Sequence, residues 1–421
     1  MTEKAEVTEK RPLLSVLGPG LVTGAADDDP SGVGTYSQVG AQFGYGLAWT
    51  MLFGYPLLAA IQEVCARIGA VTGKGIAQNL RQHYPRALLQ VVVLLLLIAN
   101  VINLGADLGA MAESLGLLLP GPQMAYVVGF GVISVLIEVL VPYKNYARVL
   151  KWTTLSLFAY VGVVFVSHVP LAEAARGVLI PSFTFDKPHA MALVAIFGTT
   201  ISPYLFFWQA GQEVEEQHRR HVKPLMVSPR DAGPELKRIR TDTMVGMAFS
   251  HITALFIVVA TAATLHANGI THIDTAGQAA QALRPIAGNL AFGLFALGII
   301  GTGLLAVPIL AGSAAYAVSE TFGWAEGLER KPREAKAFYG VIAVATLGGI
   351  VLNLLGIDPM KALYWAAAVN GLLAPPLMVV TMLIARNPKV MGEMTISNWL
   401  AFGGWVSTAV MGVVAAVFLL S

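Results

Sequence analysis

The feature that most constrains the fold is a recurring pattern of long apolar runs. A helix that crosses the hydrocarbon core needs about 20 predominantly apolar residues, because its backbone N–H and C=O groups find no water there. About eleven such runs follow one another along this chain. The expected spans are 14–38, 46–70, 88–114, 122–141, 149–168, 190–214, 243–266, 288–318, 337–356, 361–385 and 396–420.

Composition supports the same class of protein. Of the 421 residues, 56% are apolar and only 12% are charged. An ordinary soluble domain carries roughly twice that share of charged residues, at about 25%. The sequence therefore predicts an all-α protein that spans the bilayer many times.

Two of the expected spans contain a helix breaker together with polar residues at bilayer depth. The first span holds Asp-Asp-Asp-Pro at 27–30, and the sixth holds Thr-Thr-Ile-Ser-Pro at 199–203. Proline removes a backbone donor, and unwound backbone is tolerated in a membrane only beside a buried cavity. The breaks lie five spans apart, where two inverted five-helix repeats would place corresponding elements. We expect one transmembrane domain with repeats at about 14–168 and 190–385, and an extra helix at about 396–420.

The three carboxylates of the first break point to a cation. A charge at the bilayer centre costs at least ~2.5 kcal/mol, so at least one of Asp27, Asp28 and Asp29 should meet a cation, a proton or water. Asp29 is the best candidate because Pro30 follows it directly. Half-helix ends and unwound carbonyls offer oxygen near the midplane, so the substrate site is expected between the two breaks.

The distribution of basic residues predicts the orientation. Lys and Arg accumulate on cytoplasmic loops, and here they precede the first span and follow the even-numbered spans. These residues are Lys4, Lys10, Arg11, Lys74, Arg81, Arg86, Lys144, Arg148, Lys151, Arg219, Arg220, Lys223, Arg230, Lys237, Arg238, Arg240, Arg330, Lys331, Arg333, Lys336, Arg386 and Lys389. We expect an integral protein of the bacterial inner membrane with a cytoplasmic N-terminus and the C-terminus outside.

Other kinds of site are not favoured. The single cysteine, Cys65, allows neither a disulfide framework nor a multi-cysteine metal site. The glycine-rich segment 18–24 lacks the preceding strand and the lysine of a phosphate loop, so an enzyme is not expected. The expected partners are a small inorganic cation, as substrate rather than cofactor, and membrane lipid. No nucleic acid is expected, and a monomer is favoured.

At the two breaks and in several other segments, the sequence resembles the NRAMP (natural resistance-associated macrophage protein) family of proton-coupled divalent metal transporters. The resemblance covers nearly the whole chain and implies a LeuT-type inverted-repeat fold. The segments that carry it are 18–20 (Gly-Pro-Gly), 29–30 (Asp-Pro), 43–45 (Phe-Gly-Tyr), 72–75 (Thr-Gly-Lys-Gly), 83–86 (His-Tyr-Pro-Arg), 106–108 (Ala-Asp-Leu), 387–392 (Asn-Pro-Lys-Val-Met-Gly) and Trp399.

The metal-binding motifs of the family are altered in this chain. Asp29 keeps the metal carboxylate, but the asparagine of the family's Asp-Pro-Gly-Asn is Gly32, and the family's methionine before the second proline is Ser202. A thioether favours softer metals, whereas oxygen ligands suit Mg²⁺, Ca²⁺ or Mn²⁺. The resemblance is therefore closest in character to the NRAMP-related magnesium transporters. It implies a metal site made of Asp29, the carbonyls of Ala26 and Thr199, Ser202, and Asp28 as an added carboxylate.

The proton pathway of the family is altered as well. The histidine that follows the second proline is Tyr204, whose phenol does not titrate at neutral pH. Asp107 keeps an acidic position, but the next one expected is Ala110, and Glu113 comes a turn later. Asp107, Tyr204 and Glu113 are thus candidates for a proton or gating role. We expect alternating-access transport of Mg²⁺ or Mn²⁺ without obligatory proton coupling.

Two other functions stay open on the sequence. One is transport of a different solute, a monovalent cation or a small organic molecule. The other is a sensor or scaffold that moves nothing and uses the basic segment 217–242 to dock a partner. A further intramembrane carboxylate, Glu138, is expected to make a structural hydrogen bond.

Overall fold

Helices form almost all of the molecule in the computed structural model, which describes residues 18–141 and 153–421. Within those residues, nine helices are long and apolar enough to cross a membrane. The first expected span appears in addition as two shorter helices, α2 and α3. The fifth appears as η1 (Thr153–Leu157) and α9 (Phe158–Val166), while residues 14–17 and 149–152 of the expected spans lie outside the described part.

The long helices follow the expected spans closely. They are α4 (Trp49–Thr72), α6 (Arg86–Gly116), α7 (Gln123–Leu140), α13 (Ala232–Thr264), α16 (Ala291–Phe322), α17 (Lys336–Leu352), α18 (Pro359–Ala385) and α20 (Asn398–Leu420). Short elements connect them: α5 (Ile76–His83), α10 (Leu171–Leu179), η2 (Pro229–Asp231), η3 (His266–Asn268), α14 (Ala276–Ala280), η4 (Gln281–Leu283), α15 (Arg284–Ala287), η5 (Gly288–Leu290), η6 (Asn353–Leu355) and α19 (Pro388–Met391).

Both predicted breaks are present. The first span divides into α2 (Pro19–Asp27) and α3 (Pro30–Phe43), and the sixth into α11 (Lys187–Thr200) and α12 (Pro203–Arg219). Pro30 and Pro203 each occupy the first position of the second half-helix. At the first position of a helix the backbone N–H has no partner within that helix, so a proline loses no hydrogen bond there. Because proline cannot continue the preceding helix, the same residue ends one half-helix and begins the next.

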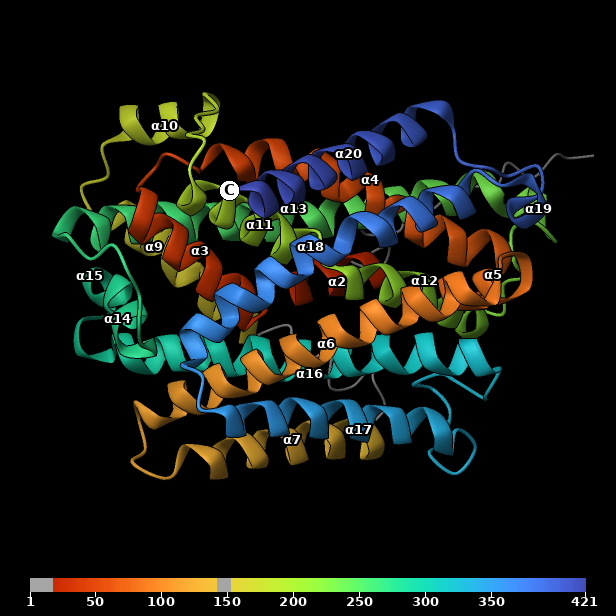
Figure 1. Ribbon diagram of the computed structural model, residues 1–421, viewed down its shortest axis with the longest axis horizontal. Coiled ribbons are helices and arrows are strands. Elements are labelled where there is room, and N and C mark those ends of the chain that lie inside the picture. The colour runs from red at the N-terminus through yellow and green to blue at the C-terminus, as the bar shows by residue number, and fades with distance from the viewer. Residues whose placement is uncertain (1–17, 142–152) are drawn as a thin grey trace, which may run out of the picture.

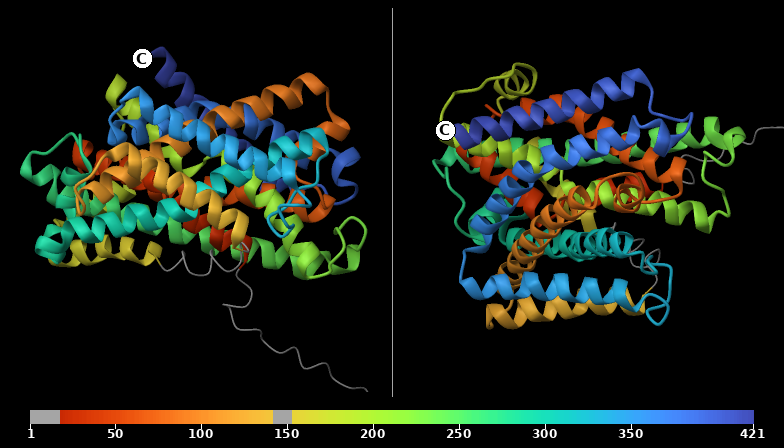
Figure 2. Two further views of the ribbon diagram at one scale, coloured as in Figure 1. Left: turned by 90° about the horizontal axis from the view of Figure 1, so that it is seen from below. Right: turned by 45° about the vertical axis from the view of Figure 1, so that its right-hand side comes forward.

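The broken helices occupy the middle of the bundle (Figure 1). Half-helix α2 packs against α12, α13 and α16, and α3 packs against α6, α13 and α18. Helices α7 and α17 form a layer at one side, packed on each other and on α6, and α20 lies on the opposite side (Figures 1 and 2). The breaks are therefore surrounded by the long helices α6, α13, α16 and α18.

Close helix packing around the breaks depends on small residues. A side chain on Gly24 of α2 would collide with the backbone of Gly246 on α13, and one on Gly198 of α11 would collide with the backbone of Gly371 on α18. Small residues at such crossings let two membrane helices approach closely, which is the usual basis of their packing. Half-helices α2 and α11 are thus packed tightly against the unbroken helices α13 and α18.

The basic segment 217–242 is helical at both ends. Helix α12 continues to Arg219 and α13 begins at Ala232, so only 220–231 connects them. That connection is anchored, since the N–H groups of Leu225 and Met226 donate to carbonyls of α4. Ion pairs of Arg220 with Glu235 and of Arg238 with Glu213 also join the end of α12 to the start of α13.

Candidate cation site

The first break is organised by Asp29. Its backbone is extended, with φ −68° and ψ 171°, and its carboxylate oxygen Oδ1 accepts a hydrogen bond of 2.6 Å from the N–H of Gly32. This is the N-cap interaction of a helix, in which an acidic side chain satisfies an N–H of the first turn. The local sequence therefore both starts α3 and fixes the position of a carboxylate that is only 2% exposed.

The second oxygen of Asp29 faces two other spans. Oδ2 lies 3.3 Å from the amide nitrogen of Asn103 on α6 and 3.4 Å from the hydroxyl of Tyr204 on α12. The same hydroxyl lies 3.0 Å from the carbonyl oxygen of Ala26. Because one hydroxyl carries one proton, Tyr204 donates to either Ala26 or Asp29 at a given moment. Tyr204 thus links the second break to the first.

The second break is satisfied within its own helix. The hydroxyl of Ser202 lies 2.8 Å from each of the carbonyl oxygens of Gly198 and Thr199. The hydroxyl of Thr200 donates to the carbonyl of Ile196 at 3.0 Å. The oxygen of Ser202 keeps its lone pairs, and a carbonyl oxygen has two, so Ser202 and Thr199 can still offer oxygen to a cation.

Asp107 belongs to the same surroundings as Asp29, and Glu113 does not. Asp107 is fully buried on α6 and accepts from the N–H of Ser31 at 3.2 Å, while its Oδ2 has no partner. Glu113 lies further along α6 and accepts from the N–H of Ala276 at 2.8 Å, at the start of α14. The structure brings together three of the predicted residues, Asp29, Asp107 and Tyr204, and leaves Glu113 apart.

Asp27 and Asp28 face a different helix. The hydroxyl of Ser250 on α13 lies 2.6 Å from Oδ2 of Asp27 and 3.2 Å from Oδ1 of Asp28. Both carboxylates are completely buried, and Oδ1 of Asp27 and Oδ2 of Asp28 have no partner. The structure therefore turns Asp28 toward α13 rather than toward the partners of Asp29.

In the described part of the chain, the carboxylates at the first break and Asp107 beside it have no positively charged partner. Of the ion pairs found in residues 18–141 and 153–421, none involves Asp27, Asp28, Asp29 or Asp107. Nor do those residues contain a group of three or more His, Cys, Asp or Glu side chains placed to hold a metal. A cation here would be held by few carboxylates, supplemented by carbonyl and hydroxyl oxygens and water. That is the oxygen-rich, partly hydrated environment that suits a hard cation.

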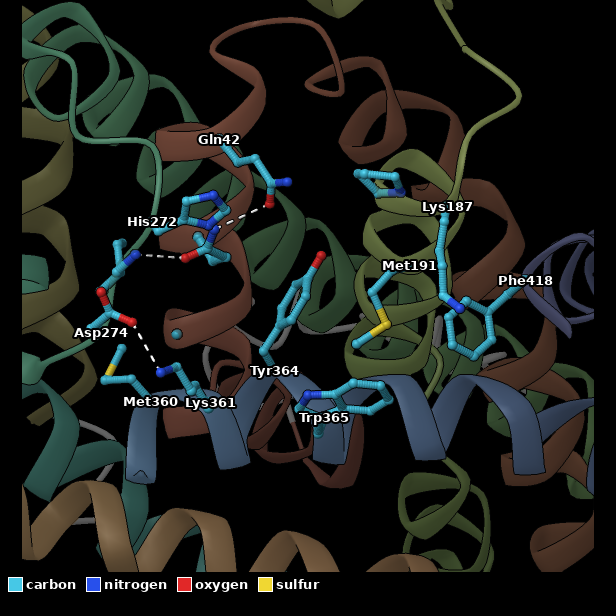
Figure 3. A pocket seen from close by; sticks show the side chains of 14 residues that line it. Gln42, Lys187, Met191, His272, Asp274, Met360, Lys361, Tyr364, Trp365 and Phe418 are labelled. Atoms are coloured by element: carbon cyan, nitrogen blue, oxygen red, sulfur yellow. Dashed lines mark hydrogen bonds and ion pairs between the residues drawn. The ribbon is translucent and has the colours of Figure 1, made fainter. Parts of the chain in front are cut away.

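A pocket of about 400 Å³ lies on one side of the breaks, toward the end of the molecule that carries α14. Gly34, one turn beyond Pro30, contributes to its wall, and a salt bridge of 3.2 Å joins Lys361 to Asp274 across it (Figure 3). Gln38 ties the 271–274 segment to α3, because its side chain accepts from the N–H of Ile273. The wall of the pocket thus includes part of α3, the half-helix that begins at the first break.

On the opposite side the start of α2 is held by ionic groups. Asp242 on α13 accepts from the N–H groups of Gly18, Gly20 and Leu21, at 2.9, 2.8 and 3.1 Å. Arg238, one turn earlier, pairs with Glu213 of α12 at 2.5 Å. Asp242 therefore acts as a helix cap for α2 that is supplied by another span.

Several of these partners were not predicted from the sequence. Asn103 lies one turn before Asp107 on the same face of α6, so helical spacing could have indicated it. Ser250 and Asp242 were harder to predict as partners. The sequence does not show which residue a polar side chain in a long apolar span will contact, because that depends on how the helices pack. Within residues 18–141 and 153–421, neither oxygen of Glu138 has a partner for the hydrogen bond that was expected.

A bundle of membrane helices in which two central spans unwind around buried carboxylates and carbonyls defines a transporter of the broken-helix type. The structure of Mhp1, a nucleobase-cation-symport-1 family transporter in a closed conformation, matches 96% of this chain and 91% of its own, with a TM-score of 0.60 and 15% identity. A manganese transporter of Eremococcus coleocola, in complex with an aromatic bis-isothiourea substituted compound, gives a TM-score of 0.77 over 98% of this chain and 87% of its own, at 15% identity. These likenesses confirm the LeuT-type fold.

The family is established by the sequence. The model of the family described as natural resistance-associated macrophage protein-like (Nramp) matches residues 20–421, and the chain belongs to that family of membrane transporters. Among its relatives is the divalent metal cation transporter MntH of Klebsiella pneumoniae strain 342. It is 26% identical over an alignment of 414 positions, which covers 94% of this chain and 92% of the relative. The predicted resemblance is confirmed, and the protein is a transporter rather than an enzyme.

Proposed function

We propose that this transporter carries a hard divalent cation, Mg²⁺ or Mn²⁺, by alternating access. The observation that carries the proposal is the buried Asp29 carboxylate, fixed at the first break and linked through Tyr204 to the second. The relatives named as divalent metal cation and manganese transporters support a divalent cargo. A carboxylate compensates much of the charge that a cation would otherwise bring uncompensated into the membrane.

The ligands we propose are Asp29, the carbonyls of Ala26 and Thr199, and the hydroxyl oxygen of Ser202. The amide oxygen of Asn103 has no partner and lies on the residue that contacts Asp29, so it adds a neutral oxygen to the same region. No thioether belongs to this set, which favours a hard cation over a soft one. Asp28 increases the negative charge of the break from the side of α13.

We further propose that transport does not require a proton. Tyr204 replaces the histidine of the family's motif, and its hydroxyl is engaged with Ala26 and Asp29. Asp107 remains as a structural or gating group beside Asp29, and Glu113 holds the start of α14. The span that contains α17 offers no arginine for a proton exit path.

The proposed setting is the bacterial inner membrane, with the α5 end of the molecule in the cytoplasm and the C-terminus outside. The basic residues of the described loops cluster at the α5 end, as the positive-inside rule requires. A single domain with repeats at about 14–168 and 190–385 would move as a bundle against a scaffold. The pocket near α14 would be the outer access to the site, and a monomer would suffice.

The test is uptake into proteoliposomes that contain the purified protein, with Mg²⁺, Mn²⁺ and Ca²⁺ supplied in turn and internal pH followed by a dye. Uptake of Mg²⁺ or Mn²⁺ without acidification, abolished by Asp29→Ala, is the expected result. Acidification that depends on the metal would contradict uncoupled transport. Absence of flux for all three cations would contradict the cargo and favour another solute or a non-transporting role.

A further inference from the structure

Half-helix α2 is joined to α12 and α13 by a chain of polar groups that the cargo site does not use. The hydroxyl of Thr23 lies 2.6 Å from the amide oxygen of Gln209 on α12, and the amide nitrogen of Gln209 lies 3.4 Å from Oε1 of Glu213. The other oxygen of Glu213 pairs with Arg238 on α13, one turn before Asp242, which caps α2. The chain therefore holds α2 to two of its neighbours.

This chain lies between the first break and the α5 end of the molecule. Thr23 is one turn before Ala26, whose carbonyl belongs to the proposed cargo site. Gln217, one turn after Glu213, donates to the carbonyl of Ala70, near the end of α4 and shortly before α5 begins. Thr23 and Glu213 are completely buried. A path along α2 from the α5 end to the cargo site therefore opens only when α2 parts from α12 or α13.

Asp242 holds α2 through both charge and hydrogen bonds. Its oxygens accept from three N–H groups at the start of the half-helix, and the contact with Gly20 is the shortest, at 2.8 Å. Gly20 permits this approach, because a side chain there would collide with the backbone of Thr243. A carboxylate is favoured at a helix N-terminus, where the first N–H groups have no partner within the helix. Release of α2 would leave the buried carboxylate uncompensated unless another group replaced those N–H groups.

Arg238 is placed to bind Asp242 when α2 leaves. Its guanidinium contacts Glu213 through Nη2 at 2.5 Å and Glu235 through Nε at 2.7 Å. The remaining nitrogen, Nη1, lies 3.8 Å from Oδ2 of Asp242, the same oxygen that accepts from Gly20. A hydrogen-bonded pair of opposite charges is closer, at about 2.7–2.9 Å. Asp242 therefore has one complete partner in α2 and a second partner within reach.

We propose that Asp242 controls the gate at the α5 end, which is the contact of α2 with α12 and α13, by exchanging α2 for Arg238 when the gate opens. In the closed state Asp242 holds the N–H groups of α2. In the open state it pairs with Nη1 of Arg238, and the released N–H groups face the water that enters. Each state satisfies the buried carboxylate, as a bistable element requires. The inference rests on the alternating access of the proposed function, and Asp242 is a positioning residue that does not touch the cargo.

The reactivity of a cysteine placed within this gate tests the proposal without any cargo. Thr23→Cys is combined with Cys65→Ala, so that the purified full-length protein carries one thiol, and its reaction rate with a water-soluble maleimide is measured in detergent. With Asp242→Asn added, the thiol should react about tenfold faster, the effect of one charge lost at a helix N-terminus. Adding Glu213→Gln and Arg238→Gln together removes the second partner of Asp242 without changing the net charge. The thiol should then react about threefold more slowly, the effect of one weak ion pair lost from the open state.

Two controls separate control of the gate from general loosening of the bundle. The native Cys65 is completely buried on α4, and where it is the single thiol it should stay unreactive with and without Asp242→Asn. Asp358 caps α18 through two N–H groups of its first turn. Asp358→Asn is therefore the matched variant, and it should leave the reactivity of Thr23→Cys unchanged. If the double variant does not fold, Arg238→Lys should slow the reaction as well, because an ammonium lacks the fork that reaches several carboxylates.

Three results would overturn the proposal. One is a Thr23→Cys rate that Asp242→Asn leaves unchanged. Another is a native Cys65 that becomes equally reactive, which would show loosening of the whole bundle. The third is a faster reaction in the variant that lacks both Glu213 and Arg238, which would show that their ion pair itself keeps the gate shut. The measurement uses no cation, so these results leave the proposed cargo standing, and absence of cation uptake in the wild type would contradict the cargo alone.

Discussion

The two helix breaks differ in how their polar groups are satisfied. At the second break the hydroxyls of Thr200 and Ser202 donate to carbonyls of their own helix. At the first break three successive carboxylates reach three other spans, and Asp27 and Asp28 each keep an oxygen without a partner. Proline and unwound backbone alone do not make a charged site.

The difference assigns separate tasks to the breaks. The first supplies the negative charge that attracts a cation, and the second supplies neutral oxygen atoms whose positions are fixed by their own helix. Tyr204 joins them, since its hydroxyl lies close to both Ala26 and Asp29. In a membrane interior, where charge is costly, the first break should dominate affinity and the second should adjust selectivity.

The largest expected effect is at the first break. Asp29→Asn keeps the shape of the side chain and removes its charge, so Mn²⁺ uptake into proteoliposomes should fall by at least about a hundredfold, equivalent to about 3 kcal/mol for one member of a buried charge pair. Asp231→Asn, at an exposed position, should leave uptake unchanged. Uptake preserved in Asp29→Asn would remove the distinction between the breaks.

A smaller effect is expected at the second break. Ser202→Ala removes one neutral oxygen ligand and should weaken Mn²⁺ uptake by about tenfold, the effect of losing one polar contact. Thr200→Val is its control, because the Thr200 hydroxyl is committed to Ile196, and it should change uptake by less than about twofold. A loss in Ser202→Ala as large as that in Asp29→Asn would mean that the second break contributes equally.

Loss of the Tyr204 hydroxyl, which links the two breaks, should have a smaller effect and should strengthen cation binding rather than weaken it. Tyr204→Phe removes the hydroxyl that occupies the Ala26 carbonyl in the empty site, so Mn²⁺ should bind about threefold more tightly, a gain of about 0.7 kcal/mol within the range of one hydrogen bond. Equilibrium binding measures this directly. Weaker binding in Tyr204→Phe would show that the hydroxyl is itself a ligand.

The smallest effect lies outside both breaks, at the α5 end. The pKa of Glu326 is raised from 4.5 to about 7, mainly by burial and also by nearby Glu215, while Arg81 and Arg330 partly oppose the increase. The folded protein therefore holds more protons than the unfolded chain between those pH values, so this residue's contribution to stability falls as pH rises from about 4.5 to 7.

Glu326→Gln should remove that part of the pH dependence. Its melting temperature in detergent should decline less than that of the wild type between pH 5 and pH 8, and the two should converge at the acidic end. Uptake at neutral pH should be the same in both proteins. A wild-type decline that persists in Glu326→Gln would place the titrating group elsewhere, at one of the breaks or beyond.

The sequence was sufficient for the spans and for both breaks, because apolar runs of membrane length and proline at bilayer depth are local signals. It also identified Asp29, Asp107 and Tyr204, which the structure places together. It could not give the direction in which each carboxylate points. The turn of Asp28 toward Ser250 depends on the packing of α2 on α13, which small residues such as Gly24 and Gly246 permit.

The basic segment 217–242, which follows the sixth span, is a second example of what the sequence could not predict. Its charges left open a segment that docks a partner, yet Arg238 pairs with Glu213 and Asp242 accepts from the first N–H groups of α2. Charge density along a sequence does not reveal which charges find buried partners. That information resides in the packing of distant helices.

The most direct test of a cation held at the first break is anomalous diffraction from crystals grown with Mn²⁺. The expected result is a peak within about 2.5 Å of the Asp29 carboxylate, between the carbonyls of Ala26 and Thr199, that disappears in Asp29→Asn. A peak only in the pocket near Lys361 and Asp274, or a peak at the breaks that survives Asp29→Asn, would contradict the account.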